Sequence, residues 1–212
     1  MVRRSTKGVM VGGVMVGGGA RRSVQSMTNT DTHDAQATAM QIASLKNAGC
    51  DIVRIAVPDI EAAETVKYIK SRIPEIPLVA DIHFDYRIAL KCAEYGVDKI
   101  RINPGNIGDE ERVRAVCAAC RERNIPIRIG VNGGSLEKHL LEKYGAPTPE
   151  ALFESAEGHI RLLNKFDFDD IVISVKSSDV SSAVAACRYV AQRCNYPLHI
   201  GVTEAGSSRM GI

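Results

Sequence analysis

Four apolar segments of this chain each contain one basic residue where a buried strand should be uniformly apolar. A strand inside a parallel sheet normally reads as a near-continuous run of Val, Ile and Leu. A charge that is removed from water without a partner is strongly destabilising. The four charges therefore predict one shared polyanionic ligand, and a diphosphate is the best candidate. They are Arg54 in D-I-V-R-I-A-V-P, Arg101 in K-I-R-I-N-P-G-N, Arg128 in I-P-I-R-I-G-V-N and Lys176 in I-V-I-S-V-K.

Side-chain alternation along these strands adds further polar groups to the same face. Residues i and i+2 of an extended strand point to the same side. An alternative interpretation pairs the cations with carboxylates such as Asp81 or Glu204 in a structural network, because buried polar groups need only be satisfied. The residues that share a face by this rule are Arg101 with Asn103, Arg128 with Gly130 and Asn132, Lys176 with Ser174, and Asp81 with His83.

Composition limits the classes of protein that this chain can belong to. Its 212 residues, 45% of them hydrophobic, can form one substantial core, so one domain is expected. No uninterrupted apolar run is long enough to span a membrane. Glycines interrupt the apolar segment that follows the basic start, so this segment is a poor match to the apolar core of a signal peptide. A cytoplasmic protein is therefore expected. The balance of 27 basic and 25 acidic residues, with no Trp, argues against nucleic-acid binding.

The six cysteines are expected to be structural rather than metal-binding or redox-active. Cys117 and Cys120 fall on one stripe of an amphipathic helix, well away from the helix N-terminus that a reactive thiol would favour. Cys187 and Cys194 are seven residues apart, in step with Val184 on another helix. The histidines at 139, 159 and 199 show no metal-ligand spacing and are expected to be surface or packing residues.

Strand and helix patterns alternate along almost the whole chain. Seven strands and six helices are expected after a glycine-rich hairpin at residues 1–22, and residues 23–212 would form the main domain. Such alternation predicts a parallel sheet with right-handed crossovers. The spacing favours an incomplete (β/α)8 barrel of the TIM type, whose functional groups lie at the carboxyl ends of the strands. An open doubly wound sheet is the alternative, but no G-x-G-x-x-G follows the first strand.

A series of motifs resembles a known enzyme family. In order, they are V-Q-S-M-T-N-T-D-T, V-R-I-A-V-P, A-D-I-H-F, R-I-N-P-G-N-I-G and R-I-G-V-N-G-G-S-L, and the resemblance spans about residues 5 to 206. Together they resemble the 4-hydroxy-3-methylbut-2-enyl diphosphate synthases of the non-mevalonate isoprenoid pathway. The resemblance implies a barrel that binds a cyclic diphosphate of methylerythritol and a separate C-terminal domain with a [4Fe-4S] cluster. It also implies electrons from flavodoxin or ferredoxin, and a homodimer.

The resemblance also implies roles for individual residues. Phosphate-binding basic residues of the family match the four cations already singled out by the strand pattern. Arginine suits this task because its planar guanidinium can form two hydrogen bonds to phosphate oxygens. The remaining matches are Asn103 and Asn132 as amide donors in the pocket, Asp81 and His83 as contacts to hydroxyls of the substrate, and Glu204 at the end of the last expected strand, where pairing with Lys176 or Arg128 is the alternative.

The chain also departs from the family pattern. One strand and two helices of a complete barrel are missing, as is the cluster domain, so no metal ligand, no bound cluster and no independent catalysis are expected from this chain. At the N-terminus, A-R-R-S-V-Q stands where the family more often has A-P-I-x-V-Q. Two other functions stay open: a truncated, non-catalytic diphosphate-binding barrel, and another phosphate-ligand barrel enzyme of the pterin-transferase type.

Overall fold

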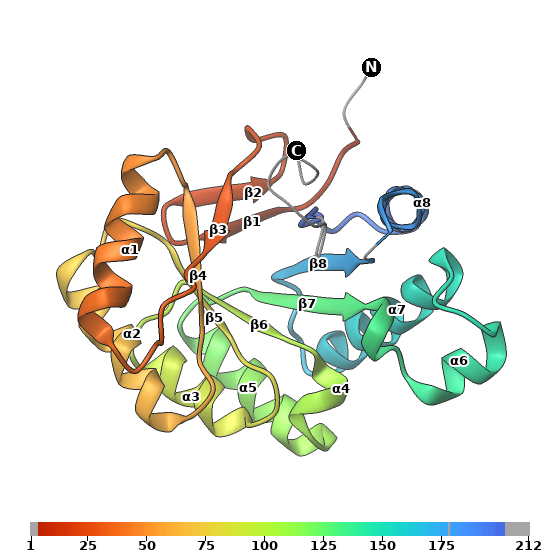
Figure 1. Ribbon diagram of the computed structural model, residues 1–212. Helices are drawn as coiled ribbons and strands as arrows, with labels where there is room; N and C mark the ends of the chain where they lie inside the picture. Colours follow the sequence, from red (N-terminus) through yellow and green to blue (C-terminus); the bar gives the residue numbers. More distant parts are fainter. Residues whose placement is uncertain (1–3, 178, 202–212) are drawn as a thin grey trace.

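The six strands of the main sheet are parallel and lie side by side in chain order. The structure is a computed structural model, which describes residues 4–177 and 179–201. A doubly wound sheet would reverse its strand order at a switch point, whereas this sheet curls with helices on its outer face (Figure 1). The expected TIM-type architecture is therefore confirmed. The strands are β3 (Gln25–Met27), β4 (Ile52–Ala56), β5 (Leu78–Asp81), β6 (Lys99–Ile102), β7 (Ile127–Asn132) and β8 (Ile171–Lys176).

The six expected helices are present, and each begins at a residue whose side chain caps its first turn. An Asp or Thr oxygen accepts a hydrogen bond from a backbone amide that lacks a partner within the helix. These caps fix where the chain turns from strand to helix. The helices and their caps are α1 (Ala35–Asn47) with Asp34, α2 (Ile60–Arg72) with Asp59, α3 (Tyr86–Glu94) with Asp85, α5 (Glu110–Glu122) with Asp109, α7 (Pro149–Lys165) with Thr148, and α8 (Val180–Arg193) with Asp179.

Two additional helices lie in the loops that follow β6 and β7, so the expected count of six was wrong. They are α4 (Pro104–Ile107) and α6 (Lys138–Tyr144), and a 3₁₀ turn spans Gly133–Ser135. Both are too short to show the repeated apolar spacing by which longer helices were predicted. They place extra structure at the carboxyl ends of the strands, where a TIM-type barrel carries its functional groups.

The seventh expected strand is reduced to a single bridge in the described part of the chain. Leu198 pairs in parallel with Ile173 of β8. The Ile173 amide donates to the Pro197 carbonyl over 3.0 Å, and the His199 amide donates to the Ile173 carbonyl over 2.8 Å. The rest of this expected strand, including Glu204, lies outside the described residues.

The glycine-rich opening forms the expected hairpin and covers the floor of the barrel. Strands β1 (Gly8–Val11) and β2 (Val14–Gly17) pair antiparallel across a turn at Gly12, whose φ of 54° favours glycine. Val11 is fully buried and packs with Ile52 and Val79 of the main sheet. The hairpin therefore seals the amino-terminal end of the barrel with an apolar cluster.

Helix packing confirms the interpretation of Cys117 and Cys120, which are buried with Val113 and Val116 on one face of α5. The stripe expected on α8 was wrong. Its buried residues are Ala183, Ala186 and Val190, while Val184 is exposed and Cys187 and Cys194 are half-buried against the core. Positions one residue apart on a helix differ by about 100°, so an Ala-rich sequence leaves the buried face ambiguous. No helix in the described ranges has the length and apolar character needed to cross a membrane.

Candidate anion-binding site inside the barrel

Five of the sequence-predicted residues occupy paired positions on neighbouring strands. The Cα atom of Arg101 on β6 pairs with Asp81 on β5 and with Arg128 on β7. Four residues further along β7, Asn132 pairs with Lys176 of β8. Side chains at paired positions of a parallel sheet point to the same side. The register therefore brings these polar groups from four strands onto one face.

Asp81 is the carboxylate around which two of the arginines gather. Arg101 Nη1 lies 3.0 Å from Asp81 Oδ1, and Arg54 Nε lies 3.6 Å from Asp81 Oδ2. His83 Nε2 is 3.5 Å from the same Oδ2 atom. Burial raises the pKa of Asp81, but the charges of Arg101 and Arg54 outweigh it and hold that pKa below its ordinary value. Two of the predicted cations thus pair with Asp81, as the structural-network alternative expects, although one carboxylate neutralises only one of them.

Arg128 is the most completely buried charge of the set. Its side chain is 0% exposed, and none of its three guanidinium nitrogens has a hydrogen-bond partner among the described residues. Burial and the nearby Arg54 lower the pKa of Arg128 to about 9, against the opposing effect of Asp81. A buried donor group without an acceptor is destabilising, so this guanidinium is suited to an anion that enters from outside.

Lys176 lies between two cavities. One has a volume of about 800 Å³ and is also lined by Arg54, whereas the other, of about 790 Å³, is also lined by Asn132. Burial and the charge of Arg54, followed by those of Arg128 and Arg101, lower the pKa of Lys176 to about 8. A lysine at this junction can contact an anion in either cavity.

The N-P-G-N and R-I-G-V-N segments shape the site through their backbones. Asn103 is 8% exposed, and its side-chain oxygen accepts a hydrogen bond from the Gly105 amide over 3.1 Å as the cap of α4. Its amide nitrogen has no such role and can donate to a ligand. At Gly130, an added Cβ would lie 2.5 Å from Arg101 Nε. Glycine at this position therefore leaves room for the arginine that contacts Asp81.

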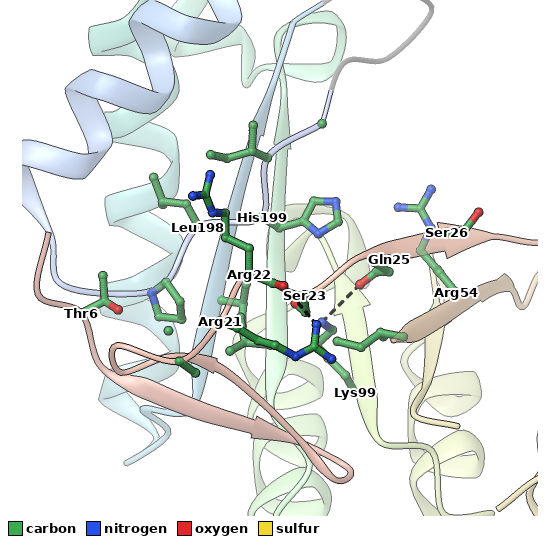
Figure 2. A pocket seen from close by; sticks show the side chains of 18 of the residues that line it. Thr6, Arg21, Arg22, Ser23, Gln25, Ser26, Arg54, Lys99, Leu198 and His199 are labelled. Atoms are coloured by element: carbon green, nitrogen blue, oxygen red, sulfur yellow. Dashed lines mark hydrogen bonds between the residues drawn. The ribbon is translucent and has the colours of Figure 1, made fainter. Parts of the chain in front are cut away.

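Three site residues were missed by the sequence reasoning. Lys99 is 2% exposed and lines the 800 Å³ cavity together with Gln25 and His199 (Figure 2). Lys99 could have been found, because it precedes Arg101 by two residues and shares its face. His199, expected to be a surface or packing residue, lies among cations instead. Burial and the charges of Arg128 and Lys99 lower the pKa of His199 to about 2, so its ring is neutral at neutral pH.

The other histidines agree with their expected roles: His139 is exposed, and His159 is buried 3.0 Å from Glu137. No group of three or more His, Cys, Asp or Glu side chains in the described ranges could hold a metal ion. Burial raises the pKa of Cys92 and of Cys117 to about 12, which disfavours the thiolate that an iron–sulfur cluster requires. The described cysteines do not fit such a cluster.

Sequence comparison places this arrangement in a known family. Residues 6–212 match the family described as GcpE TIM-barrel domain. The chain is 61% identical over 209 residues to the 4-hydroxy-3-methylbut-2-en-1-yl diphosphate synthase (flavodoxin) of Photorhabdus laumondii. This match covers 99% of this chain and 56% of the relative. It is 60% identical over 211 residues to the enzyme of the same name from Clostridium perfringens, and that match covers 100% of this chain and 60% of the relative.

Solved structures of much lower sequence identity share the fold. A truncated 3-deoxy-D-arabino-heptulosonate 7-phosphate synthase from Thermotoga maritima has a TM-score of 0.65 at 14% identity, over 92% of this chain and 68% of that chain. A dihydropteroate synthase from Xanthomonas albilineans has a TM-score of 0.58 at 13% identity, over 90% of this chain and 91% of that chain. These similarities concern the fold alone, so they give no support to the pterin-transferase alternative.

The chain spans 56–60% of the length of these curated relatives. The resemblance drawn from the five motifs is confirmed, because the family match extends over nearly all of the sequence. The chain therefore belongs to the GcpE TIM-barrel domain family.

Proposed function

We propose that the inner face of the barrel binds the diphosphate of 2-C-methyl-D-erythritol 2,4-cyclodiphosphate. As part of a longer protein, the barrel would serve an oxidoreductase that converts this substrate into 4-hydroxy-3-methylbut-2-enyl diphosphate for isoprenoid biosynthesis. The names of the relatives support the reaction. The observation that carries the binding proposal is the fully buried guanidinium of Arg128, which has no partner among the described residues.

Each predicted residue has a role that its chemistry and position allow. The arginines donate paired hydrogen bonds to phosphate oxygens, and the lysine acts as a compact point charge. The single carboxylate Asp81 keeps two arginines in place and leaves the face with excess positive charge. The proposed phosphate contacts are Arg54, Arg101, Arg128 and Lys176, with Asn103 and Asn132 as amide donors, and Asp81 and His83 beside the hydroxyls of the substrate. Glu204 stays a proposed contact outside the described residues.

Reductive opening of the cyclic diphosphate needs electrons, for which we propose flavodoxin or ferredoxin as donor. The name of the curated relatives specifies flavodoxin. The [4Fe-4S] cluster expected from the family does not fit the described cysteines, so we derive no step through it. We propose that its ligands belong to another part of the full-length protein. The chemistry assigned to the barrel is binding and orientation of the charged substrate in a partly enclosed cavity.

Two further features of the full-length protein are proposals of the same kind. We propose a cytoplasmic location, which agrees with six free cysteines in a chain with no disulfide in its described part. We propose a homodimer, in which a second subunit would complete the open end of the barrel. The homodimer rests on the family resemblance, whereas the cytoplasmic location rests on the glycine-broken apolar segment near the N-terminus and on the free cysteines.

Calorimetric titration with the cyclic diphosphate tests the binding proposal. Arg101→Ala is expected to weaken binding by about 1.5–3 kcal/mol, roughly 10- to 100-fold in Kd, because a hydrogen bond to a charged group is lost. Arg114→Ala, on the exposed side of α5, is the matched control and should bind as the unmodified chain does. Unchanged affinity of Arg101→Ala in a folded chain would show that the ligand binds elsewhere.

A further inference from the structure

Lys99 is a buried cation of the barrel interior that is not among the proposed phosphate contacts. It is the first residue of β6, and its Cα atom pairs with Val79, which in turn pairs with Arg54 on β4. Val79 also belongs to the apolar cluster formed with Val11 and Ile52 at the hairpin floor. Lys99 therefore lies beside that apolar floor, two residues before the level at which Asp81, Arg101 and Arg128 are paired.

The ammonium group of Lys99 has little compensation for its burial. The side chain is 2% exposed, and the hydrogen bond that it donates to Gln25 Oε1 is long, at 3.4 Å (Figure 2). Gln25 comes from β3, so this contact crosses the interior of the curled sheet. A neutral amide oxygen at this distance is a weak partner for a positive charge.

The cationic groups around Lys99 disfavour the protonated form of its amine. Burial, the Arg128 guanidinium on β7 and the Arg54 guanidinium on β4 lower the pKa of Lys99 to about 7. His199, which follows the bridge to β8, faces the same group of cations and is neutral. Lys176 on β8 and Arg54 line the same cavity as Lys99. The described residues that line this cavity include no Asp or Glu, so none of them provides a carboxylate to Lys99.

We propose that Lys99 is a further ligand-binding residue, whose amine donates to an anionic phosphoryl oxygen at the inner end of the 800 Å³ cavity. This inference rests on the proposed function and extends it, because it adds a contact from the floor side of the barrel. Lys99, Arg54 and Lys176 line one continuous cavity. A diphosphate held by the latter two cations therefore enters the space that Lys99 faces. Gln25 positions the amine for this contact.

The test is calorimetric titration at pH 8 in buffers of different ionisation enthalpy, with inorganic pyrophosphate and the cyclic diphosphate as separate ligands. Lys99 is mostly neutral at that pH, and a bound anion raises its pKa, so binding should take up protons from the buffer. Lys99→Met should lose part of this uptake and bind about tenfold more weakly or worse. Some proton uptake should persist in this variant, because Lys176, with a pKa of about 8, is partly neutral at pH 8 and also gains a proton. Lys67→Met, on the exposed side of α2, is the control.

A thermal unfolding scan separates binding from a structural role. Lys99→Met should unfold at a higher temperature than the unmodified chain, because an apolar side chain replaces a poorly compensated charge. A lower unfolding temperature, or unchanged affinity and proton uptake, would overturn the inference while leaving the proposed function intact. Lys99→Gln serves if the Met variant does not fold. Proton-coupled binding of pyrophosphate without binding of the cyclic diphosphate would support Lys99 and reject the proposed substrate.

Discussion

The barrel interior and the helix-covered region beside β7 both bury charged groups, but they stabilise them differently. In the second region, Ser155 Oγ donates a hydrogen bond to Glu137 Oε1 over 2.9 Å, and His159 Nε2 lies 3.0 Å from the same oxygen as an ion pair. The other carboxylate oxygen, Oε2, has no hydrogen-bond partner among the described residues. In the interior, the described residues give Arg128 no hydrogen-bond partner and Lys99 only a long one. A structural polar group comes with its partners, whereas a binding group keeps its hydrogen-bonding capacity for a ligand.

The paired region also supports the site. His159 lies beneath the N-P-G-N segment, where a Cβ added at Gly105 would be 3.2 Å from its Cε1 atom. Burial raises the pKa of Glu137, but hydrogen bonds from His159, its own backbone and Ser155 outweigh it and lower that pKa to about 2. This carboxylate therefore stays ionised over the whole physiological range, and it keeps the two loops that contain Glu137 and Gly105 in contact through one histidine.

The largest expected effect comes from Arg128→Met, which removes the most completely buried charge of the barrel interior. Removal of an uncompensated charge should raise the free energy of unfolding by about 1–4 kcal/mol, as found when buried ion pairs are replaced by hydrophobic residues. Binding of the cyclic diphosphate should weaken roughly 100-fold or more. Chemical denaturation and calorimetric titration measure the two quantities. A destabilised Arg128→Met chain would mean that Arg128 has a structural partner in the folded protein and is not an uncompensated charge.

Glu137→Gln tests the region in which a carboxylate has partners within the chain, with an expected loss of about 1–3 kcal/mol in the free energy of unfolding. The pKa of Glu137 is lower in the folded state than the unfolded value of about 4.3. Its ionic contribution is therefore complete above about pH 5 and is lost as pH falls toward 2. Unfolding measured between pH 2 and 6 should show a shallower acid dependence in Glu137→Gln. An equally steep profile would assign that dependence to other carboxylates.

Gly130→Ala should have the smallest effect, because it removes no charge and changes only the space beside Arg101. The added Cβ would lie 2.5 Å from Arg101 Nε, so the guanidinium must move away from Asp81. We expect a loss of about tenfold in affinity for the cyclic diphosphate, about 1.4 kcal/mol, with little change in folding. Gly134→Ala is the matched control, because an added Cβ there meets no atom within 4 Å. Equal affinities of the two variants would show that the position of Arg101 does not limit binding.

The repeating strand–helix units, and the face of the strand on which each cation lies, follow from local sequence patterns. Alternation along a strand is a local property, so Arg101 and Asn103 could be assigned to one face without knowledge of the fold. The capping aspartates are local as well, because each bonds an amide within three residues. The helices of the loops after β6 and β7 were not predictable in this way, since each has too few residues for a periodic pattern.

Which of these charges have partners depends on contacts that local sequence does not specify. The pairing of Arg54 and Arg101 with one carboxylate depends on the register of three neighbouring strands and on the curvature of the sheet. The same register places Lys99 beside the apolar floor and leaves Arg128 without a hydrogen-bond acceptor among the described residues. Burial and charge–charge distance fix the pKa of a group, and both are set by contacts between residues far apart in sequence.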